Sequence, residues 1–519
     1  MISLEISTLA RAMKGQLICD KSMLSVQVQN LVTDSRALKS QNALQEKSPE
    51  HSLDAFLALK GPNFDGHRFA PQVVEQGCRV LIVDHHLADI DNSKVAQIIV
   101  DDTRIALGKI AAYVKQQVAP KTVGITGSSG KTTVKEMLAA ILSRLGKVLA
   151  TQGNFNNDIG VPLTLLRLEA DHDFAVIEMG ANHIGEIAYT TELVKPDVAM
   201  INNIAAAHLE GFGDLCGVAR AKGEIFSGLS KEGVALYNKD TKYTSKWQWR
   251  LTDKTVRTFS CANSRYTDGP INTDCYSENV VLDENGCASF ELKSSLGQCV
   301  IKLTVPGKHN VCNAVAAASA AIECGATLND IQLGLADMAP VKGRLNIHQL
   351  NATHVSNKIK LIDDTYNANV ESIKAAIALL ASYSGQRILV LGDMGELGFE
   401  ARRYHQEIGE FAQQQGIKVL LTLGVLSQNT SDAFAQNSEA NSEAISEHFS
   451  DKNKLDEYLV NLLTKECAST DEIQILVKGS RSAHMEYVVE DIINWHAQQQ
   501  KESQLLSVNK LSTNQQDNA

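Results

Sequence analysis

Apolar runs that are typical of buried strands alternate with amphipathic stretches along most of the chain. In the first part, CRVLIVD and AQIIVD predict strands at 78–84 and 96–101, and the residues that follow predict a helix at 103–118. This pattern indicates a small α/β unit. Within it, the polar and turn-rich stretch 40–52 is expected to be a loop insertion.

The middle of the chain continues the same alternation over a longer stretch. Its strands are predicted at 121–126, 174–180, 198–204 and 233–238. The helical segments between them give βαβ units and therefore a parallel sheet. From about 255 to 305 polar and apolar residues alternate around a Ser-Leu-Gly turn, so a β-hairpin patch is expected there, before a helix at 313–325.

A third series of strands and helices follows, and it predicts a doubly wound, Rossmann-like domain. Its strands are predicted at 358–364, 387–393, 417–424 and 472–479. After about Gln498 the chain is polar and is expected to be disordered. The fold class is therefore α/β, with three domains and a tail, whose expected bounds are 1–118, 119–341, 342–497 and 498–519.

Composition and charge exclude several classes of protein. The 519 residues suffice for three or four domains at about 150 residues each, and 44% hydrophobic residues exclude wholesale disorder. Lys and Arg number 49 against 60 Asp and Glu, a net charge of −11, so we expect no nucleic-acid partner. No run of 18 apolar residues and no signal-peptide pattern occur, so we expect no membrane insertion and a cytoplasmic location.

The ten cysteines include no C-x-x-C pair and no Cys and His spacing that fits a zinc site. Six of them recur every 12 to 14 residues between Cys261 and Cys324, but the residues between them share no pattern. We therefore expect free thiols, buried or partly buried, in a reducing compartment.

A glycine-rich stretch, GITGSSGKTT, lies between a predicted strand and an amphipathic helix. Glycines let backbone amides turn around phosphates, and the helix N-terminus adds positive potential. Ile125 stands where the usual P-loop pattern has its first glycine, although Gly124 adjoins it, and a plain glycine-rich turn is the alternative. The residues expected to hold the phosphates of a nucleotide are Gly127, Ser128, Ser129, Gly130, Lys131, Thr132 and Thr133.

Three further residues suggest a function only when they are considered together with that loop. Glu178 lies near the end of the apolar strand FAVIEM, where the sites of α/β sheets lie, and its carboxylate suits Mg²⁺, as does the hydroxyl of Thr132. Taken alone, Glu178 is a solvated strand end, His208 a loop histidine and Lys222 a solvated helix lysine.

Two sets of segments carry a resemblance to a known family. The first set resembles the Mur ligases, ATP-dependent amino-acid ligases of peptidoglycan precursor synthesis: GITGSSGKTT, EMGANHIGEI, NIAAAHLEGFG, AKGEI, PGKHNVCNA and KGRLN. The second set is similar to members that join D-alanyl-D-alanine to UDP-N-acetylmuramoyl-tripeptide: TDSR, LKGPNFDGHRFA, GNFNNDIGVPLT, DDTYNAN, LGDMGELG and KGSRSAHME. The resemblance covers residues from about 30 to 490.

The resemblance implies a reaction in which ATP converts a carboxylate to an acyl phosphate that the incoming amine attacks. It implies ATP and Mg²⁺ as cofactors and catalytic roles for Lys131, His208 and Lys222, the last as a lysine carbamate. A carbamate makes physical sense, because an ammonium repels Mg²⁺ whereas a carbamate supplies two anionic oxygens. The implied metal-site residues are Thr132, Glu178, His208 and Lys222.

The resemblance also distributes the substrates over the three domains. Asn310 and Asn313 match adenine contacts, Arg344 a nucleotide contact and Asp364 a ribose contact, although Asn310 could also cap the following helix. The UDP site is expected in the first domain, at Ser35, Arg36, Lys60, Asp65 and His67, where a plain turn at PNFDGH is the alternative. The muramoyl peptide is expected at Asn154, Asn157 and Asp158, and the dipeptide at Asn367, Asn369, Lys478 and Arg481.

Departures from the family pattern bear on the choice between its members. Val370 follows NAN where the family usually has Pro, and the Asp-Asn-Pro-Arg signature of the ligases that add diaminopimelate is absent. The alternatives are a sister ligase, including the related folylpolyglutamate synthetases, and a P-loop nucleotide switch that makes no amide. We expect a monomer whose domains close on small-molecule substrates.

Overall fold

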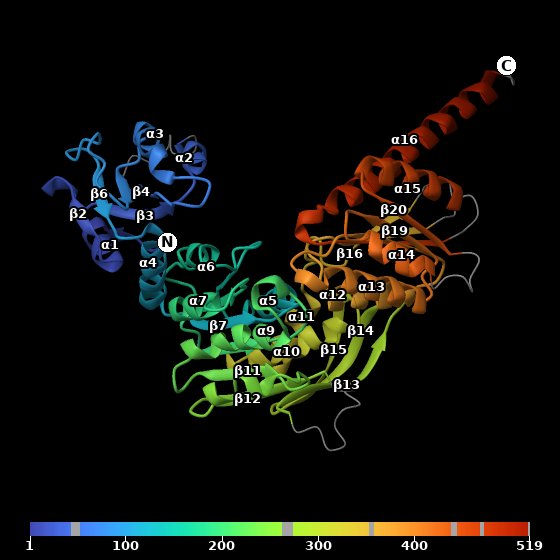
Figure 1. The fold of residues 1–519 in the computed structure, drawn as a ribbon, viewed down its shortest axis with the longest axis horizontal. Coiled ribbons are helices and arrows are strands. Elements are labelled where there is room, and N and C mark those ends of the chain that lie inside the picture. Colours follow the sequence, from blue (N-terminus) through green and yellow to red (C-terminus); the bar gives the residue numbers. More distant parts are fainter. Residues whose placement is uncertain (43–51, 262–272, 352–357, 437–443, 468–471, 517–519) are drawn as a thin grey trace.

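The computed structural model describes residues 1–42, 52–261, 273–351, 358–436, 444–467 and 472–516. These residues form three α/β units in chain order, each built on its own sheet (Figure 1). The predicted fold class is confirmed. In Figure 1 the N-terminal unit meets the rest through helix α4, and the C-terminal unit lies at the opposite end of the central sheet.

The N-terminal sheet has the strand order β1-β3-β4-β5-β6-β2 in the part of the chain that the structure describes. Strands β3 to β6 are parallel neighbours, while β1 and β2 run antiparallel at the edges. The carboxyl ends of β3, β4 and β5 therefore meet at one edge. The elements are β1 (Leu4–Glu5), α1 (Ile6–Met13), β2 (Gln16–Ile18), η1 (Lys21–Met23), β3 (Gln27–Val32), α2 (Ser35–Asn42), β4 (Ser52–Leu57), η2 (Gly66–Phe69), α3 (Ala70–Glu75), β5 (Val80–Val83), β6 (Ala96–Ile99) and α4 (Thr103–Val118).

The central sheet has the order β15-β14-β13-β12-β11-β10-β7-β9-β8 over the described residues. Strands β7 to β12 pair in parallel, β13 pairs in parallel with β12, and β13, β14 and β15 form the expected antiparallel patch. The strands are β7 (Lys121–Thr126), β8 (Val148–Ala150), β9 (Phe174–Glu178), β10 (Val198–Ile201), β11 (Val234–Asn238), β12 (Thr255–Ser260), β13 (Cys275–Leu282), β14 (Cys287–Ser294) and β15 (Gly297–Pro306). The helices are α5 (Lys131–Leu142), α6 (Gly160–Leu165), α7 (Glu186–Val194), α8 (Leu209–Phe212), α9 (Leu215–Gly223), η3 (Glu224–Gly228), η4 (Thr244–Lys246), η5 (Gln248–Arg250), α10 (His309–Glu323) and α11 (Leu328–Ala336).

The C-terminal sheet has the order β16-β17-β21-β18-β19-β20 in its described residues, parallel except for β16. Helices follow the parallel strands, as in other doubly wound sheets. The elements are β16 (Asn346–Asn351), β17 (Lys358–Asp364), α12 (Val370–Ala381), β18 (Gln386–Gly392), η6 (Gly398–Glu400), α13 (Ala401–Gln414), β19 (Val419–Leu423), α14 (Gln428–Gln436), β20 (Ile445–Phe449), α15 (Lys452–Glu466), β21 (Glu472–Lys478), η7 (Arg481–Ala483) and α16 (Glu486–Gln516).

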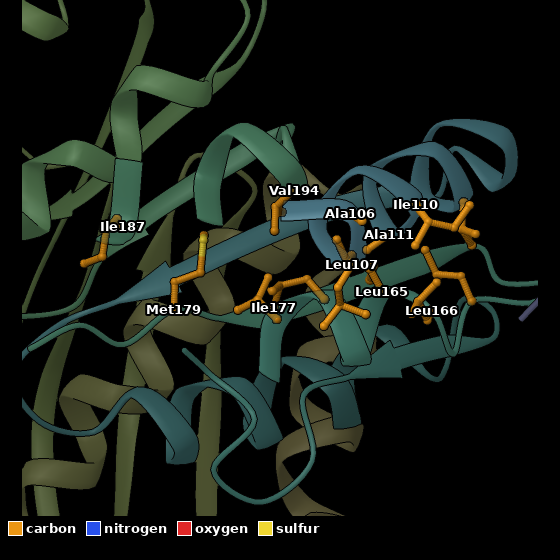
Figure 2. Packing of buried hydrophobic residues seen from close by; sticks show 14 of the residues in the cluster. Ala106, Leu107, Ile110, Ala111, Leu165, Leu166, Ile177, Met179, Ile187 and Val194 are labelled. Carbon is orange, nitrogen blue, oxygen red and sulfur yellow. The ribbon is translucent and has the colours of Figure 1, made fainter. Parts of the chain in front are cut away.

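Helix α4 joins the N-terminal and central units into one continuous core. The side chain of Asp102 caps its first turn by accepting the backbone N–H of Ile105 at 2.9 Å. Apolar residues on its inner face, among them Leu107 and Ile110, are fully buried, and Figure 2 shows them beside residues of α6, β9 and α7. Because this helix buries apolar surface on both units, it fixes one against the other.

Two local predictions were wrong. Residues 40–42 belong to helix α2 rather than to a loop insertion, and the rest of that stretch up to residue 51 lies outside the described residues. Helix α16 continues through Gln516, although the polar composition predicted a disordered tail from 498. The Gln, Glu, Lys and Leu residues of that segment are good helix formers, so polarity alone did not predict its backbone conformation.

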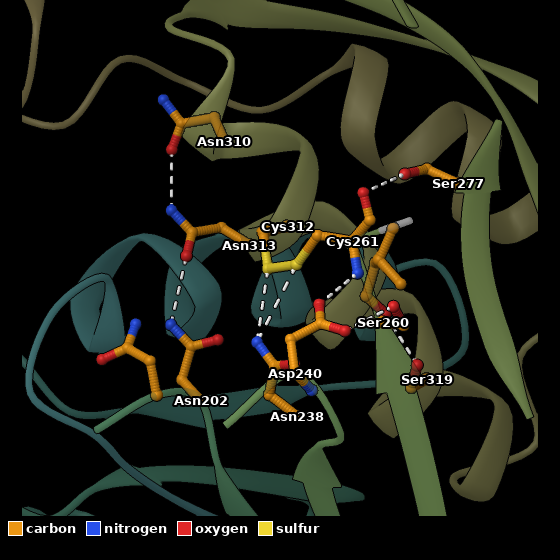
Figure 3. Close-up of a disulfide and its surroundings, with 12 residues drawn as sticks. Asn202, Asn238, Asp240, Ser260, Cys261, Ser277, Asn310, Cys312, Asn313 and Ser319 are labelled. Atoms are coloured by element: carbon orange, nitrogen blue, oxygen red, sulfur yellow. Dashed lines mark hydrogen bonds between the residues drawn. A yellow bond between two sulfur atoms is a disulfide. The ribbon is translucent and has the colours of Figure 1, made fainter. Parts of the chain in front are cut away.

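The prediction that every cysteine is free was also wrong. Cys261, after β12, forms a disulfide with Cys312 in the first turn of α10, with their Cα atoms 5.0 Å apart (Figure 3). The other eight cysteines are free thiols, as expected. The cysteines of the pair are 51 residues apart in the chain, so no local spacing could have revealed the bond.

Candidate active site

A cavity of about 1170 Å³ lies between the central and C-terminal units. Every candidate residue that sequence analysis placed in these two units lines it, except Gly127 and Lys222. The residues come from segments up to 353 positions apart in the chain, between Ser128 and Arg481. The fold therefore gathers the predicted nucleotide, metal, peptide and dipeptide residues around one space.

The glycine-rich loop lies between the end of β7 and the first residue of α5, as predicted. Gly130 adopts a left-handed conformation, with φ of 74°, and a Cβ there would lie 2.4 Å from the Oδ1 atom of Asn313, so only glycine fits. Lys131 donates to the carbonyl of Gly127 at 2.8 Å, and burial lowers the pKa of its amine. Gly124 is part of β7 and not of the loop.

Two asparagines that sequence analysis did not single out hold this loop. Asn203 Oδ1 accepts the backbone N–H groups of Ser128 at 3.1 Å and Ser129 at 2.9 Å. Asn202 Nδ2 donates to the carbonyl of Ser129 at 3.0 Å and to Asn313 Oδ1 at 3.1 Å. Both follow the apolar strand β10 directly, and that position at the carboxyl end of a parallel strand was the signal available.

The buried carboxylate of Glu178 faces the start of helix α5. Thr132 Oγ1 donates to Glu178 Oε2 at 3.0 Å, and Asn156 Nδ2 donates to Oε1 at 2.8 Å. Glu178 is 2% exposed, so the alternative of a solvated strand end is wrong. An anionic oxygen beside a hydroxyl and a phosphate loop is the hard donor set that Mg²⁺ prefers, so these residues fit the implied metal.

Lys222 lies at the end of helix α9 and is fully buried, so the alternative of a solvated lysine is wrong. Its Nζ atom has no hydrogen-bond partner among the described residues and lies 5.5 Å from the centre of the Phe212 ring. Burial, followed by the charge of Lys131, lowers the pKa of Lys222 to about 7. A large fraction of the amine is therefore neutral near pH 7.

His208 precedes helix α8 and lines the cavity, close to the same ring. Its imidazole meets Phe212 edge-on at 6.3 Å between ring centres, and its Nδ1 atom lies 2.5 Å from Oε2 of Glu396 in the C-terminal unit. His208 and Lys222 therefore both lie near the ring of Phe212.

Asn310 and Asn313 belong to the first turns of α10 and form a polar chain with the phosphate loop (Figure 3). Asn313 Nδ2 donates to Asn310 Oδ1 at 2.8 Å, and Asn310 Nδ2 donates to the carbonyl of Pro306 at 2.7 Å. The helix begins at His309 and its N-cap is Lys308, so the interpretation of Asn310 as a cap is wrong.

The C-terminal unit contributes polar groups from the segment before β16 and from the loop between β17 and α12. Arg344 Nη2 donates to Thr132 Oγ1 at 3.2 Å, while its guanidinium stacks 4.3 Å from the centre of the Tyr366 ring. Asn369 caps α12 and donates to the carbonyl of Ser128 at 3.3 Å. Both contacts connect this unit to the phosphate loop.

Lys478 is buried and directs its amine to its own domain. Its Nζ atom donates to Asp364 Oδ2 at 2.6 Å and to the carbonyl of Asn367 at 2.9 Å. Burial lowers the pKa of Lys478 despite the partly compensating charge of Asp364. Arg481, in contrast, pairs with Glu486 at 2.8 Å and keeps a side chain that is 58% exposed.

The residues expected to contact the muramoyl peptide, Asn154, Asn157 and Asp158, line the cavity before helix α6. Asn157 Oδ1 accepts the backbone N–H of Gly160 at 2.8 Å, and Asp158 pairs with Arg104 of α4 at 2.7 Å. This edge of the cavity therefore touches the helix that carries the N-terminal unit.

The five UDP candidates lie outside that cavity, at the shared carboxyl edge of β3, β4 and β5. Ser35 and Arg36 begin helix α2, and the Arg36 guanidinium pairs with Asp34 at 2.7 Å. Lys60 and Asp65 form an isolated antiparallel bridge. His67 is buried, and its Nδ1 atom lies 2.6 Å from Asp65 Oδ1. Its Nε2 atom accepts the backbone N–H of Asp84. His67 is thus held in the turn that was the alternative explanation.

Comparison with known proteins bears on each of the three units. Residues 51–115 match the Mur ligase family catalytic domain, 125–321 the Mur ligase middle domain, and 343–481 the Mur ligase glutamate ligase domain. The chain is also 47% identical over 434 residues to UDP-N-acetylmuramoyl-tripeptide--D-alanyl-D-alanine ligase of Escherichia coli K12, covering 84% of this chain and 89% of that protein.

The chain belongs to the Mur ligase family. Among solved structures, MurF from Acinetobacter baumannii is 35% identical with a TM-score of 0.82, covering 95% of this chain and 99% of that one. The MurF ligase of Thermotoga maritima, solved in complex with ADP, is 25% identical with a TM-score of 0.74, covering 91% and 98%. This Mur ligase therefore shares its whole three-domain architecture with those enzymes. The alternative of a nucleotide switch outside the family is wrong.

Proposed function

We propose that this Mur ligase uses ATP to join D-alanyl-D-alanine to UDP-N-acetylmuramoyl-tripeptide. The products are UDP-N-acetylmuramoyl-pentapeptide, ADP and phosphate, and the reaction is a step of peptidoglycan precursor synthesis. The observation that carries the proposal is the single cavity, which unites the phosphate loop with the polar loops of the C-terminal unit. The names of the E. coli and A. baumannii relatives support the same substrates.

The central unit supplies the groups that bind and neutralise ATP. In the proposed arrangement the loop amides and Lys131 hold the phosphates, Asn310 and Asn313 face the adenine, and Arg344 and Asp364 reach the nucleotide from the C-terminal unit. The contact of Arg344 with Thr132 supports this, because it brings the two units together at the phosphate loop. Catalysis then depends on placement of the carboxylate and amine and on charge stabilisation.

Mg²⁺ fits the buried oxygen donors, and when bound it neutralises phosphate charge. We assign Thr132 and Glu178 to one ion and His208 to a second, with Lys222 present as a carbamate. The carbamate forms when the neutral amine attacks CO₂, creating an N–C bond and releasing one proton. The buried amine without a described partner supports this assignment, because an ammonium there lacks both solvation and an acceptor.

The dipeptide is assigned to the C-terminal unit beside Asn367 and Asn369. Its terminal carboxylate requires a cation with free donors, and Arg481 supplies one on the cavity wall. Lys478 suits this role less well than the sequence suggested, because its amine already binds Asp364 and Asn367. We therefore assign Lys478 to support of the loop rather than to the carboxylate.

The test is a reaction in which each component is omitted in turn. ADP and phosphate should form only when UDP-N-acetylmuramoyl-tripeptide, D-alanyl-D-alanine, ATP and Mg²⁺ are all present, and mass spectrometry should detect the new amide. ATP turnover at the full rate without the dipeptide, with no amide product, would contradict the proposal.

A further inference from the structure

The segment LGDMGELG, residues 391–398, carried part of the family resemblance and lines the cavity through Gly395, Glu396 and Leu397, but the proposed reaction gives it no role. It begins at the last two residues of β18, and its first half is fixed within the C-terminal unit. Asp393 accepts the backbone N–H groups of Val425 at 2.9 Å and Ser427 at 2.7 Å. The backbone N–H of Met394 donates to His405 Nε2 at 3.1 Å. This anchoring leaves Glu396 as the carboxylate that the segment directs toward the central unit.

Glu396 reaches across the domain boundary to the segment that carries His208. Its Oε2 atom lies 2.5 Å from His208 Nδ1, and its carbonyl accepts the backbone N–H of Glu210 at 3.3 Å. A Cβ on Gly398 would lie 3.6 Å from the Cα of Glu210, so the segment passes close to the start of helix α8. Glu396 is therefore held to the start of helix α8 by both its side chain and its main chain.

Both partners of this contact have a backbone conformation that non-glycine residues rarely adopt. The φ angle is 55° at His208 and 61° at Glu396, each in the left-handed region. Such conformations cost energy and persist where the surrounding structure requires them, often at functional sites. An ordinary exposed ion pair contributes too little free energy to offset two left-handed residues that face each other.

A carboxylate on one ring nitrogen of a histidine determines what the other nitrogen can do. When Nδ1–H faces a carboxylate, the neutral ring keeps its lone pair on Nε2, and the carboxylate makes that nitrogen a better metal ligand. His208 lines the cavity, and it shares the Phe212 ring with Lys222. The close approach of Oε2 to Nδ1 therefore suits a metal-binding histidine that a carboxylate of another domain supports.

We propose that Glu396 is a positioning residue that fixes His208 for metal binding only when the C-terminal domain is docked. This inference rests on the proposed function, because it takes His208 as a metal ligand. The domain assigned to the dipeptide would then complete the metal site of the ATP-binding domain. Metal affinity and domain docking are consequently coupled through one carboxylate.

The experiment measures Mn²⁺ binding to the full chain in the presence of ADP, by electron paramagnetic resonance. Glu396→Gln should weaken Mn²⁺ binding by about 10- to 100-fold, the usual effect of removing such a supporting carboxylate. ADP affinity measured with EDTA present should not change. Glu400→Gln is the matched control, because Glu400 lies four residues away and its ion pair, at 3.1 Å, is with Arg403 of the same domain. This control should bind Mn²⁺ as the unchanged chain does.

A second comparison separates positioning from a general loss of structure. In a His208→Asn background, Glu396→Gln should cause no further loss of Mn²⁺ affinity, because the residue it positions is gone. Equal Mn²⁺ affinity in Glu396→Gln and Glu400→Gln, or an undiminished effect without His208, would overturn the inference. So would an unchanged chain that binds no Mn²⁺ with ADP. Intact Mn²⁺ binding without amide formation would instead contradict only the proposed function.

Discussion

Lys222 occupies an environment that its neighbours in the sequence, ARAKGEIF, do not indicate. A lysine near the end of a helix is usually solvated, but here the amine is 0% exposed and no described residue accepts from it. Only packing of α9 against the rest of the central unit creates this burial, so periodicity could not predict it. The family resemblance did point to Lys222, because it compares positions rather than local propensities.

The carbamate assignment predicts a pH-dependent modification of Lys222. Burial lowers its pKa to about 7, so the neutral amine that reacts with CO₂ becomes the major form as the pH rises through that value. In ¹³C-bicarbonate, a carbamate carbon signal should therefore grow between about pH 6 and pH 8. The signal should disappear in Lys222→Met.

Lys135 provides a control for that measurement. It is equally buried, but its amine donates to the carbonyl of Thr151 at 2.5 Å and pairs with Glu136 at 2.7 Å. Because its amine is already occupied by a carbonyl and a carboxylate, Lys135→Met should keep the carbamate signal. Lys222→Ala should lower kcat by at least ~10²-fold, the scale of losing one preorganised charge-stabilising group, and added acetate should restore part of it. Wild-type kcat in Lys222→Ala would refute the role.

Strands in the interior of the sheets were predicted better than those at the edges. The predicted runs correspond to β5, β6, β7, β9, β10, β11, β17, β18, β19 and β21. Edge strands β1, β2, β8, β16 and β20 were missed, because a strand with one free edge does not need a continuous apolar run. Strand β20, ISEHF, is an example with three consecutive polar residues between its two apolar ends. Interior strands β3 and β4 were missed too, since QVQNLV and SLDAFL mix polar and apolar residues.

The register between β17 and β21 determines the partner of Lys478, and the sequence alone could not predict that register. Asp364 and Lys478 end β17 and β21 at paired positions of the parallel ladder, although 114 residues separate them. Sequence analysis assigned one to the ribose and the other to the dipeptide, because it treated each motif separately. The structure places both charges in one buried pair, and such a pair is costly to break from either side.

Lys478→Met should therefore impair ATP use more than dipeptide use. Without its ammonium, Asp364 remains buried and unpaired and the Asn367 loop loses a donor, so we expect the KM for ATP to rise by at least ~10-fold. Steady-state kinetics with each substrate varied in turn measures this. Lys358→Met is the control, since Lys358 is exposed at the start of β17, the strand that ends at Asp364. A rise in the KM for D-alanyl-D-alanine alone would mean that Lys478 contacts the dipeptide directly.

The three units make a site that none of them contains alone. The cavity draws the phosphate loop from the central unit and the polar loops from the C-terminal unit, while the UDP candidates lie on the N-terminal unit beyond helix α4. Sequence motifs predicted which residues belong to each task. They could not predict which loops meet, because contacts such as Asn369 with Ser128 join residues 241 positions apart.

The choice of the acceptor depends on loops that different units bring to the cavity. With UDP-N-acetylmuramoyl-tripeptide and ATP present, kcat/KM should be highest for D-alanyl-D-alanine and far lower for diaminopimelate or lysine. Arg481→Ala should raise the KM for the dipeptide by roughly 10- to 100-fold, the effect of losing a charge-assisted hydrogen bond, and leave the KM for ATP unchanged. Arg403→Ala is the control, because Arg403 is exposed and pairs with Glu400 outside the cavity. A preference for a free diamino acid would instead assign the chain to the sister ligases, and an unchanged KM in Arg481→Ala would place the dipeptide carboxylate elsewhere.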